Sequence, residues 1–283
     1  MLKYSGKITM DEHYTKLLDI AKSLIELLEK FYSKNMIYES FSIQVTDKQI
    51  VEELKKADSD AIKNKILYKY KLFYPNYEKK CFNRLLCDFC QYMYESLHNI
   101  FEFKPQIAYT LARKPLIDDV FYLQYLYVDA EKAIDLIFSE DPKEKDVLKH
   151  KELDKQISDK IVCDLGYKEN IYHELRYADA HYGILHNCNK AMHISISRSK
   201  SEVTASGELN FIFMEDKEIE YHTKLYLDTV TILLFYVAII VIKISEGING
   251  KDKLLNETLE QLQNEFAALM GKSQILSENN SGL

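Results

Sequence analysis

Residues 230–242 read VTILLFYVAIIVI, an almost continuously apolar stretch that is bounded by Asp228 and Lys243. Its 13 residues fall short of the roughly 20 apolar residues that a helix needs to span a bilayer. A helix that is apolar on every side, yet too short to span, is typical of the centre of a helical bundle. We therefore expect a buried central helix over residues 218–244 and no membrane partner.

The rest of the chain also favours helices. The 283 residues include only eight Gly and four Pro, which are few turn-forming residues for the many turns that a β-rich fold needs. Apolar residues recur at helical spacing in residues 10–34, 75–103, 106–128 and 251–270, and a more charged helix is expected over 47–71. Pro115 lacks a backbone donor and should kink or break the helix over 106–128 near Lys114. The predicted fold is an all-α, multi-helix bundle whose central pair is 106–128 and 218–244.

One small β-hairpin is the exception that we expect. Residues 194–197 (ISIS) and 209–213 (LNFIF) alternate apolar and polar side chains around a polar connector, a pattern typical of paired strands. Residues 140–160 are dense in both charge signs, which predicts a solvated connection and a surface helix. We divide the chain into an N-terminal helical region (1–104), a helical bundle (105–270) and a flexible tail (271–283). Whether the N-terminal region is a separate domain or wraps around the second half stays open.

Charge and cysteine content narrow the classes of function. A formal net charge of −7 argues against general binding to a phosphate backbone, although a local basic groove is still possible. Five Cys without a framework spacing, and no signal peptide, predict the reducing cytoplasm. Cys87 and Cys90 have the CxxC spacing, but no second pair or His partner follows nearby. We therefore interpret them as core residues and expect no metal site there.

The histidines mark the candidate site. Four of the eight fall within 21 residues, at positions 173, 181, 186 and 193, and residues 180–201 contain no acid but carry Lys190 and two further cations. Spacings of three, four and seven put His186, Lys190 and His193 on one helical face. Three interpretations compete: a metal site, a set of hydrogen-bonded structural histidines, or a site for an anionic ligand. In the last, His acts as acid or base while Arg or Lys holds a phosphate.

Two short motifs in this stretch resemble the HEPN superfamily of helical proteins. Arg176-Tyr-Ala-Asp-Ala-His181 has an Arg and a His with four residues between them, and His186-Asn187 is followed by His193 with the Arg position taken by His186. The resemblance implies an all-helical, dimeric fold found in bacterial toxins, phage defence and RNA processing. Many such domains are metal-independent endoribonucleases in which Arg and His of two protomers face each other, and others are binding modules without the motif.

The resemblance implies two possible functions. In the first, the chain is a cytoplasmic, homodimeric endoribonuclease of phage-defence or toxin type, without a cofactor. Arg176 would then hold the scissile phosphate of RNA and His181 would act as acid or base, with His186, Asn187, Lys190 and His193 binding substrate. In the second, the chain is a non-catalytic module that oligomerises and binds a protein partner or antitoxin. A third option, a metal-dependent hydrolase, requires a carboxylate beside His186 and His193.

Overall fold

The computed structural model describes residues 9–36, 45–70, 74–139, 141–192 and 215–280, and every regular element among them is a helix. The all-α bundle is therefore confirmed for this part of the chain, whereas the hairpin expected at 194–213 lies outside the described residues. The helices are α1 Glu12–Met36, α2 Lys48–Lys55, α3 Asp60–Lys69, α4 Tyr74–Phe101, α5 Pro105–Arg113, the π-helix η1 Lys114–Asp119, α6 Val120–Val128, α7 Ala130–Phe138, the 3₁₀ helix η2 Val147–His150, α8 Lys151–Asp164, α9 Ile171–Tyr177, α10 Ile184–Met192, α11 Asp216–Asn249 and α12 Lys253–Asn280.

Helix α11 is the central helix of the bundle. Within residues 230–242 only Ile232 and Ile239 are partly exposed, and the other side chains are buried. Helix α11 packs against α1, α4, α5, α6, α9 and α12. Its 34 residues contain an 18-residue window with a mean hydropathy of 2.4, which by length and composition could cross a membrane, but 78% of that window is buried within the protein. The expectation of a buried central helix over residues 218–244 is confirmed, and α11 extends a few residues beyond both expected ends.

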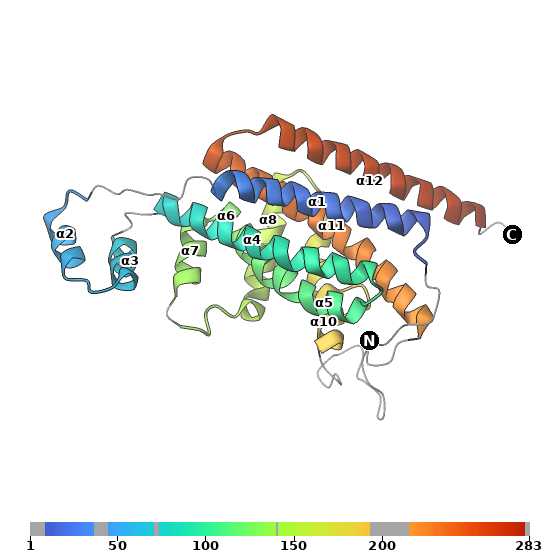
Figure 1. The fold of residues 1–283 in the computed structure, drawn as a ribbon, viewed down its shortest axis with the longest axis horizontal. Coiled ribbons are helices and arrows are strands. Elements are labelled where there is room, and N and C mark those ends of the chain that lie inside the picture. Colours follow the sequence, from blue (N-terminus) through green and yellow to red (C-terminus); the bar gives the residue numbers. More distant parts are fainter. Residues whose placement is uncertain (1–8, 37–44, 71–73, 140, 193–214, 281–283) are drawn as a thin grey trace, which may run out of the picture.

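The N-terminal helices belong to the same core as the rest of the bundle. Helix α1 lies between α4, α11 and α12, and α12 runs alongside it at the edge of the molecule (Figure 1). Apolar side chains from α1 and α4 join one continuous cluster with those of α5–α11. Residues 9–36 and 74–101 therefore wrap around the second half. Helix α12 also continues to Asn280, past the boundary expected at residue 270.

The single helix expected over residues 47–71 is replaced by two short ones. Helix α2 begins after Asp47, whose carboxylate accepts the backbone N–H of Gln49 at 2.8 Å. Helix α3 begins after Ser59, whose hydroxyl accepts the backbone N–H of Ile62 at 3.3 Å. Ser is a preferred N-cap residue, so it favours a new start over continuation. The pair extends beyond one end of the bundle (Figure 1).

Pro115 breaks the expected helix over 106–128 in the place predicted. Helix α5 ends at Arg113, and residues Lys114–Asp119 form a π-helical turn before α6 begins. Pro115 has no N–H to give to the helix, and the π-helical turn that contains it is a rare form that occurs mostly as a single turn inside α-helices. The carbonyls of Leu116 and Ile117 in this turn accept hydrogen bonds from a side chain of another helix, Arg176.

Candidate functional site

Arg176 projects from α9 into the core instead of a cleft. Its side chain is fully buried, and its guanidinium forms a bidentate ion pair with Asp154 of α8. The Nη1–Oδ1 distance is 2.9 Å and the Nη2–Oδ2 distance is 2.8 Å. Nε donates to the carbonyl of Leu116 at 2.7 Å, Nη2 to that of Ile117 at 2.9 Å and Nη1 to the Gln124 side chain at 3.1 Å. These acceptors engage all five N–H groups that a guanidinium has.

The guanidinium of Arg176 keeps its charge although it is buried. Burial opposes the charged form of Arg176, but the adjacent Asp154 carboxylate outweighs it and raises the pKa of the guanidinium. The Tyr177 hydroxyl donates to Asp154 Oδ2 at 2.5 Å, and burial raises the pKa of that tyrosine. Both oxygens of Asp154 therefore accept hydrogen bonds. A buried ion pair is tolerated when its polar atoms are satisfied in this way.

Polar side chains of α8, α11 and the N-cap of α9 extend this network. The Gln124 amide donates to the Tyr236 hydroxyl of α11 at 2.7 Å, and the Ser158 hydroxyl of α8 lies 3.3 Å from the same oxygen. Asn170, which caps α9, donates to Ser158 at 2.9 Å. The Arg176 network thus joins α6, α8, α9, α11 and η1, and its arrangement fits a structural connection because no open position remains for a ligand.

His181 lies apart from Arg176, on the surface. It sits in the loop between α9 and α10, where its ring is exposed and meets the edge of Tyr182 with 5.5 Å between ring centroids. The structure therefore does not bring the Arg176 and His181 side chains together within one chain. To bind a scissile phosphate, the guanidinium of Arg176 would have to leave Asp154. The predicted roles of Arg176 and His181 in one site therefore do not fit the geometry within one chain.

The second motif forms a compact turn around the N-terminus of α10. His186 Nδ1 lies 2.9 Å from Asp179 Oδ1, with the imidazole side chain 2% exposed and the carboxylate side chain 44% exposed. The Asn187 amide donates to the carbonyls of His181 at 2.6 Å and Gly183 at 3.0 Å. Asn187 therefore fixes the loop instead of facing a ligand, while the His186–Asp179 dyad has the geometry of a carboxylate-oriented imidazole.

Gly183 is required by the same turn. A Cβ at this position would lie 2.0 Å from the carbonyl oxygen of Ala178, a distance that no side chain tolerates. Of the two remaining predicted residues, Lys190 is half-buried on α10 and His193 lies outside the described residues.

Asp154 is the residue that the sequence interpretation missed. Its segment was expected to be a solvated connection and surface helix, yet Asp154, Ile157, Ser158, Ile161 and Val162 of α8 are buried. Their spacing of three, four, seven and eight residues is the signature of a core-facing helix stripe. Dense charge on the other faces of α8 concealed this stripe, which a count of helical periodicity would have found.

Two further charged side chains, Lys114 and Asp119, belong to η1. Burial raises the pKa of Asp119 to about 7, although Lys114 opposes this shift from 3.2 Å away. Lys114 also contacts the carboxylate of Asp88 on α4.

Within the described residues no group of three His, Cys, Asp or Glu side chains is placed to hold a metal ion. Cys90 of the CxxC pair is buried and Cys87 is partly buried on α4.

The chain was compared with protein-family models, with curated proteins and with solved structures, and none of the three comparisons finds a match.

Proposed function

We propose that this chain is a non-catalytic helical interaction module, HEPN-like in type, that acts by binding protein. The observation that carries this proposal is the enclosed Arg176, whose N–H groups are all engaged by Asp154, Gln124 and two backbone carbonyls. Withdrawing the guanidinium toward a phosphate would leave Asp154 as an unpaired buried charge, at a cost of about 3–5 kcal/mol. That cost supports a binding role over RNA cleavage by Arg176 and His181.

An exposed aromatic ridge on α4 supports the same proposal. Tyr94 is 59% exposed and Phe101 is 53% exposed, and their spacing of seven residues puts both on one side of the helix. Lys22 of α1 lies 4.8 Å from the centre of the Phe101 ring. Exposed aromatic residues are enriched at protein interfaces, where they act as anchors. We therefore assign the binding surface to this ridge, with a second copy of the chain as the occupant to test first.

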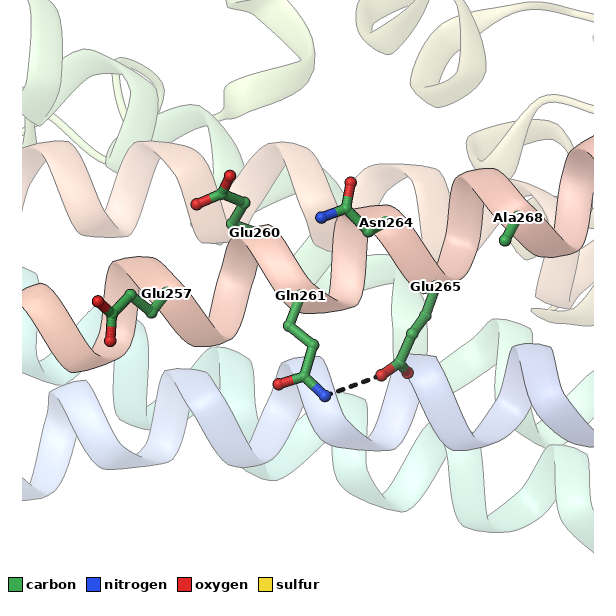
Figure 2. Close-up of a pocket in the computed structure, with 6 residues that line it drawn as sticks. All are labelled: Glu257, Glu260, Gln261, Asn264, Glu265 and Ala268. Atoms are coloured by element: carbon green, nitrogen blue, oxygen red, sulfur yellow. Dashed lines mark hydrogen bonds between the residues drawn. The ribbon is translucent and has the colours of Figure 1, made fainter.

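The outer face of α12 is a poor surface for RNA. Figure 2 shows the exposed side chains of Glu257, Glu260 and Glu265 along α12, with Glu265 directed toward α1 beside Gln261, which donates to Glu265 at 3.0 Å. Three carboxylates on one exposed face repel a phosphate backbone, whose binding depends on clustered cations.

The experiment measures self-association of the full chain by analytical ultracentrifugation. We expect a dimer that Phe101→Ser or Tyr94→Ser weakens by roughly tenfold or more, because aromatic anchors often contribute 2 kcal/mol or more. Tyr167→Ser is the matched control, since Tyr167 is a tyrosine 48% exposed that lies on neither α4 nor α5. A chain that remains monomeric at all concentrations, or a dimer that is equally sensitive to the control, would contradict the assigned surface.

The second candidate function is metal-independent RNA cleavage by the His186–Asp179 dyad. The 2.9 Å contact between Nδ1 and the carboxylate would orient an imidazole for acid–base chemistry. The test is RNA cleavage in EDTA by the wild-type chain beside His186→Ala, His181→Ala and a matched Gln variant of the exposed Lys155. The interaction-module proposal expects no cleavage by any of these proteins. Cleavage that His186→Ala abolishes and the Lys155 variant retains would overturn it.

A further inference from the structure

A separate cavity of about 360 Å³ opens between α4, α6 and α7. Its walls are largely apolar and include Leu85 of α4, Tyr122 of α6, and Ile137 and Phe138 of α7. The volume falls at the small end of the range of about 300–1,000 Å³ typical of ligand pockets. None of its lining residues belongs to the Arg176 network or to the turn around His186, so the cavity is distinct from the candidate site.

Three cations surround this apolar cavity. Lys80 and Arg84 come from successive turns of α4, and Lys145 comes from the segment between α7 and η2. Among the residues that the structure describes, none of the three side chains forms an ion pair or hydrogen bond. None of the described residues that line the cavity is a carboxylate, although the chain has 44 acids and 37 Lys and Arg. Unpaired cations gathered on an apolar wall are complementary to a ligand that is both anionic and apolar.

The cavity is held in shape by contacts around it. The Tyr122 hydroxyl donates to the backbone carbonyl of Lys145 at 3.3 Å, which ties the third cation to α6. Cys81 lines the cavity beside the α4 cations, and burial raises the pKa of its thiol to about 11 while Arg84 and Lys80 oppose that shift. The thiol therefore stays protonated at neutral pH and is a poor nucleophile, so the cavity is suited to binding and not to covalent chemistry.

We propose that this cavity binds a free, medium-chain amphiphile with one anionic head group, held by Lys80, Arg84 and Lys145. The apolar tail would lie against Leu85, Ile137 and Phe138. A volume of about 360 Å³, divided by the about 30 Å³ that a water-sized group occupies in a liquid, accommodates about a dozen non-hydrogen atoms. A carboxylate or phosphate on a chain of about ten carbons has this size, and this site is independent of the protein-binding role proposed above.

The test titrates the full chain with decanoate and decyl phosphate below their micelle concentrations, beside decanol and decyltrimethylammonium. Affinity is measured by isothermal calorimetry, and the position of the ligand by chemical-shift changes of the Ile137 and Leu85 methyl groups. We expect both anions to bind with these methyl shifts, and decanol and the cation to bind at least tenfold more weakly. Equal binding of decanol, or shifts confined to other methyl groups, would overturn the proposal.

Charge-neutral variants of the α4 cations give a second test. We expect the Lys80→Gln/Arg84→Gln double variant to lose at least tenfold in affinity for decanoate, because it removes two cations that can donate charge-assisted hydrogen bonds to the carboxylate. Lys79→Gln on the same helix is the matched control, since Lys79 does not line the cavity. Arg84 is exposed and Lys80 half-buried, so the variants should keep the wild-type melting temperature. An unchanged affinity in the double variant would sink the proposal.

A vesicle arm separates a free ligand from a membrane lipid. The chain is mixed with phosphatidylglycerol vesicles and with phosphatidylcholine vesicles and then sedimented. The proposal expects binding of monomeric decanoate without co-sedimentation. Co-sedimentation with phosphatidylglycerol alone, together with no binding of decanoate or decyl phosphate, would replace the free-ligand site with a lipid-surface contact. No binding in any arm would also overturn the proposal.

Discussion

Arg176→Met is the most informative single substitution in this protein. The Met side chain has a comparable length and no charge, so it removes the cation while largely filling the space. Asp154 then remains fully buried without its partner, and the carbonyls of Leu116 and Ile117 lose a donor. Removing one partner of a buried pair costs about 3–5 kcal/mol, and the loss of the two hydrogen bonds to backbone carbonyls costs about 0.5–1.5 kcal/mol each. We expect a total loss of about 4–8 kcal/mol, against a typical unfolding free energy of about 5–15 kcal/mol.

Urea denaturation followed by circular dichroism measures this loss, in a cycle with Asp154→Leu and the double variant. We expect Arg176→Met/Asp154→Leu to recover about half of the summed single losses, because no buried charge is left alone. His181→Ala should change stability by less than about 0.5 kcal/mol, as expected for an exposed residue. A loss below about 1 kcal/mol for Arg176→Met, or strict additivity in the double variant, would refute the structural role assigned to the pair.

Two further predictions concern backbone space and pH. Gly183→Ala should destabilise the chain by about 1–3 kcal/mol, because its Cβ would meet the Ala178 carbonyl oxygen at 2.0 Å; Gly247→Ala in open space on α11 is the control and should gain about 0.5–1 kcal/mol in thermal unfolding. The pKa of Asp119 is raised to about 7 in the folded chain, so the native state binds more protons than the unfolded state between about pH 4 and pH 7. Stability should therefore fall as pH rises through that window, by at most roughly 4 kcal/mol, and Asp119→Asn should flatten this slope in urea titrations at fixed pH. A slope that is unchanged in Asp119→Asn would show that other groups cause it.

The local sequence pattern was sufficient to predict most of the helices. The apolar run within α11, the start of α5 at Pro105 and the break at Pro115 are each determined by residues close in sequence, because helical periodicity and the missing N–H of proline act within one or two turns. The same reasoning failed for residues 47–71, because Ser59 caps the start of a second helix where one continuous helix was predicted. In α8 the charged faces dominated the composition, so the buried stripe around Asp154 was overlooked.

The candidate site was decided by tertiary structure. The sequence by itself determined that Arg176, His181, His186 and Asn187 lie close together along the chain, and that cations outnumber acids from residue 180 to 201. It did not determine which way Arg176 points, because its partners Asp154 and Leu116 are 22 and 60 residues away along the chain. A motif of one Arg and one His has the same spacing whether the Arg is enclosed or exposed. Only the packing of α6, α8 and η1 around Arg176 of α9 allows that charge to be buried, since these elements supply an acceptor for every N–H group.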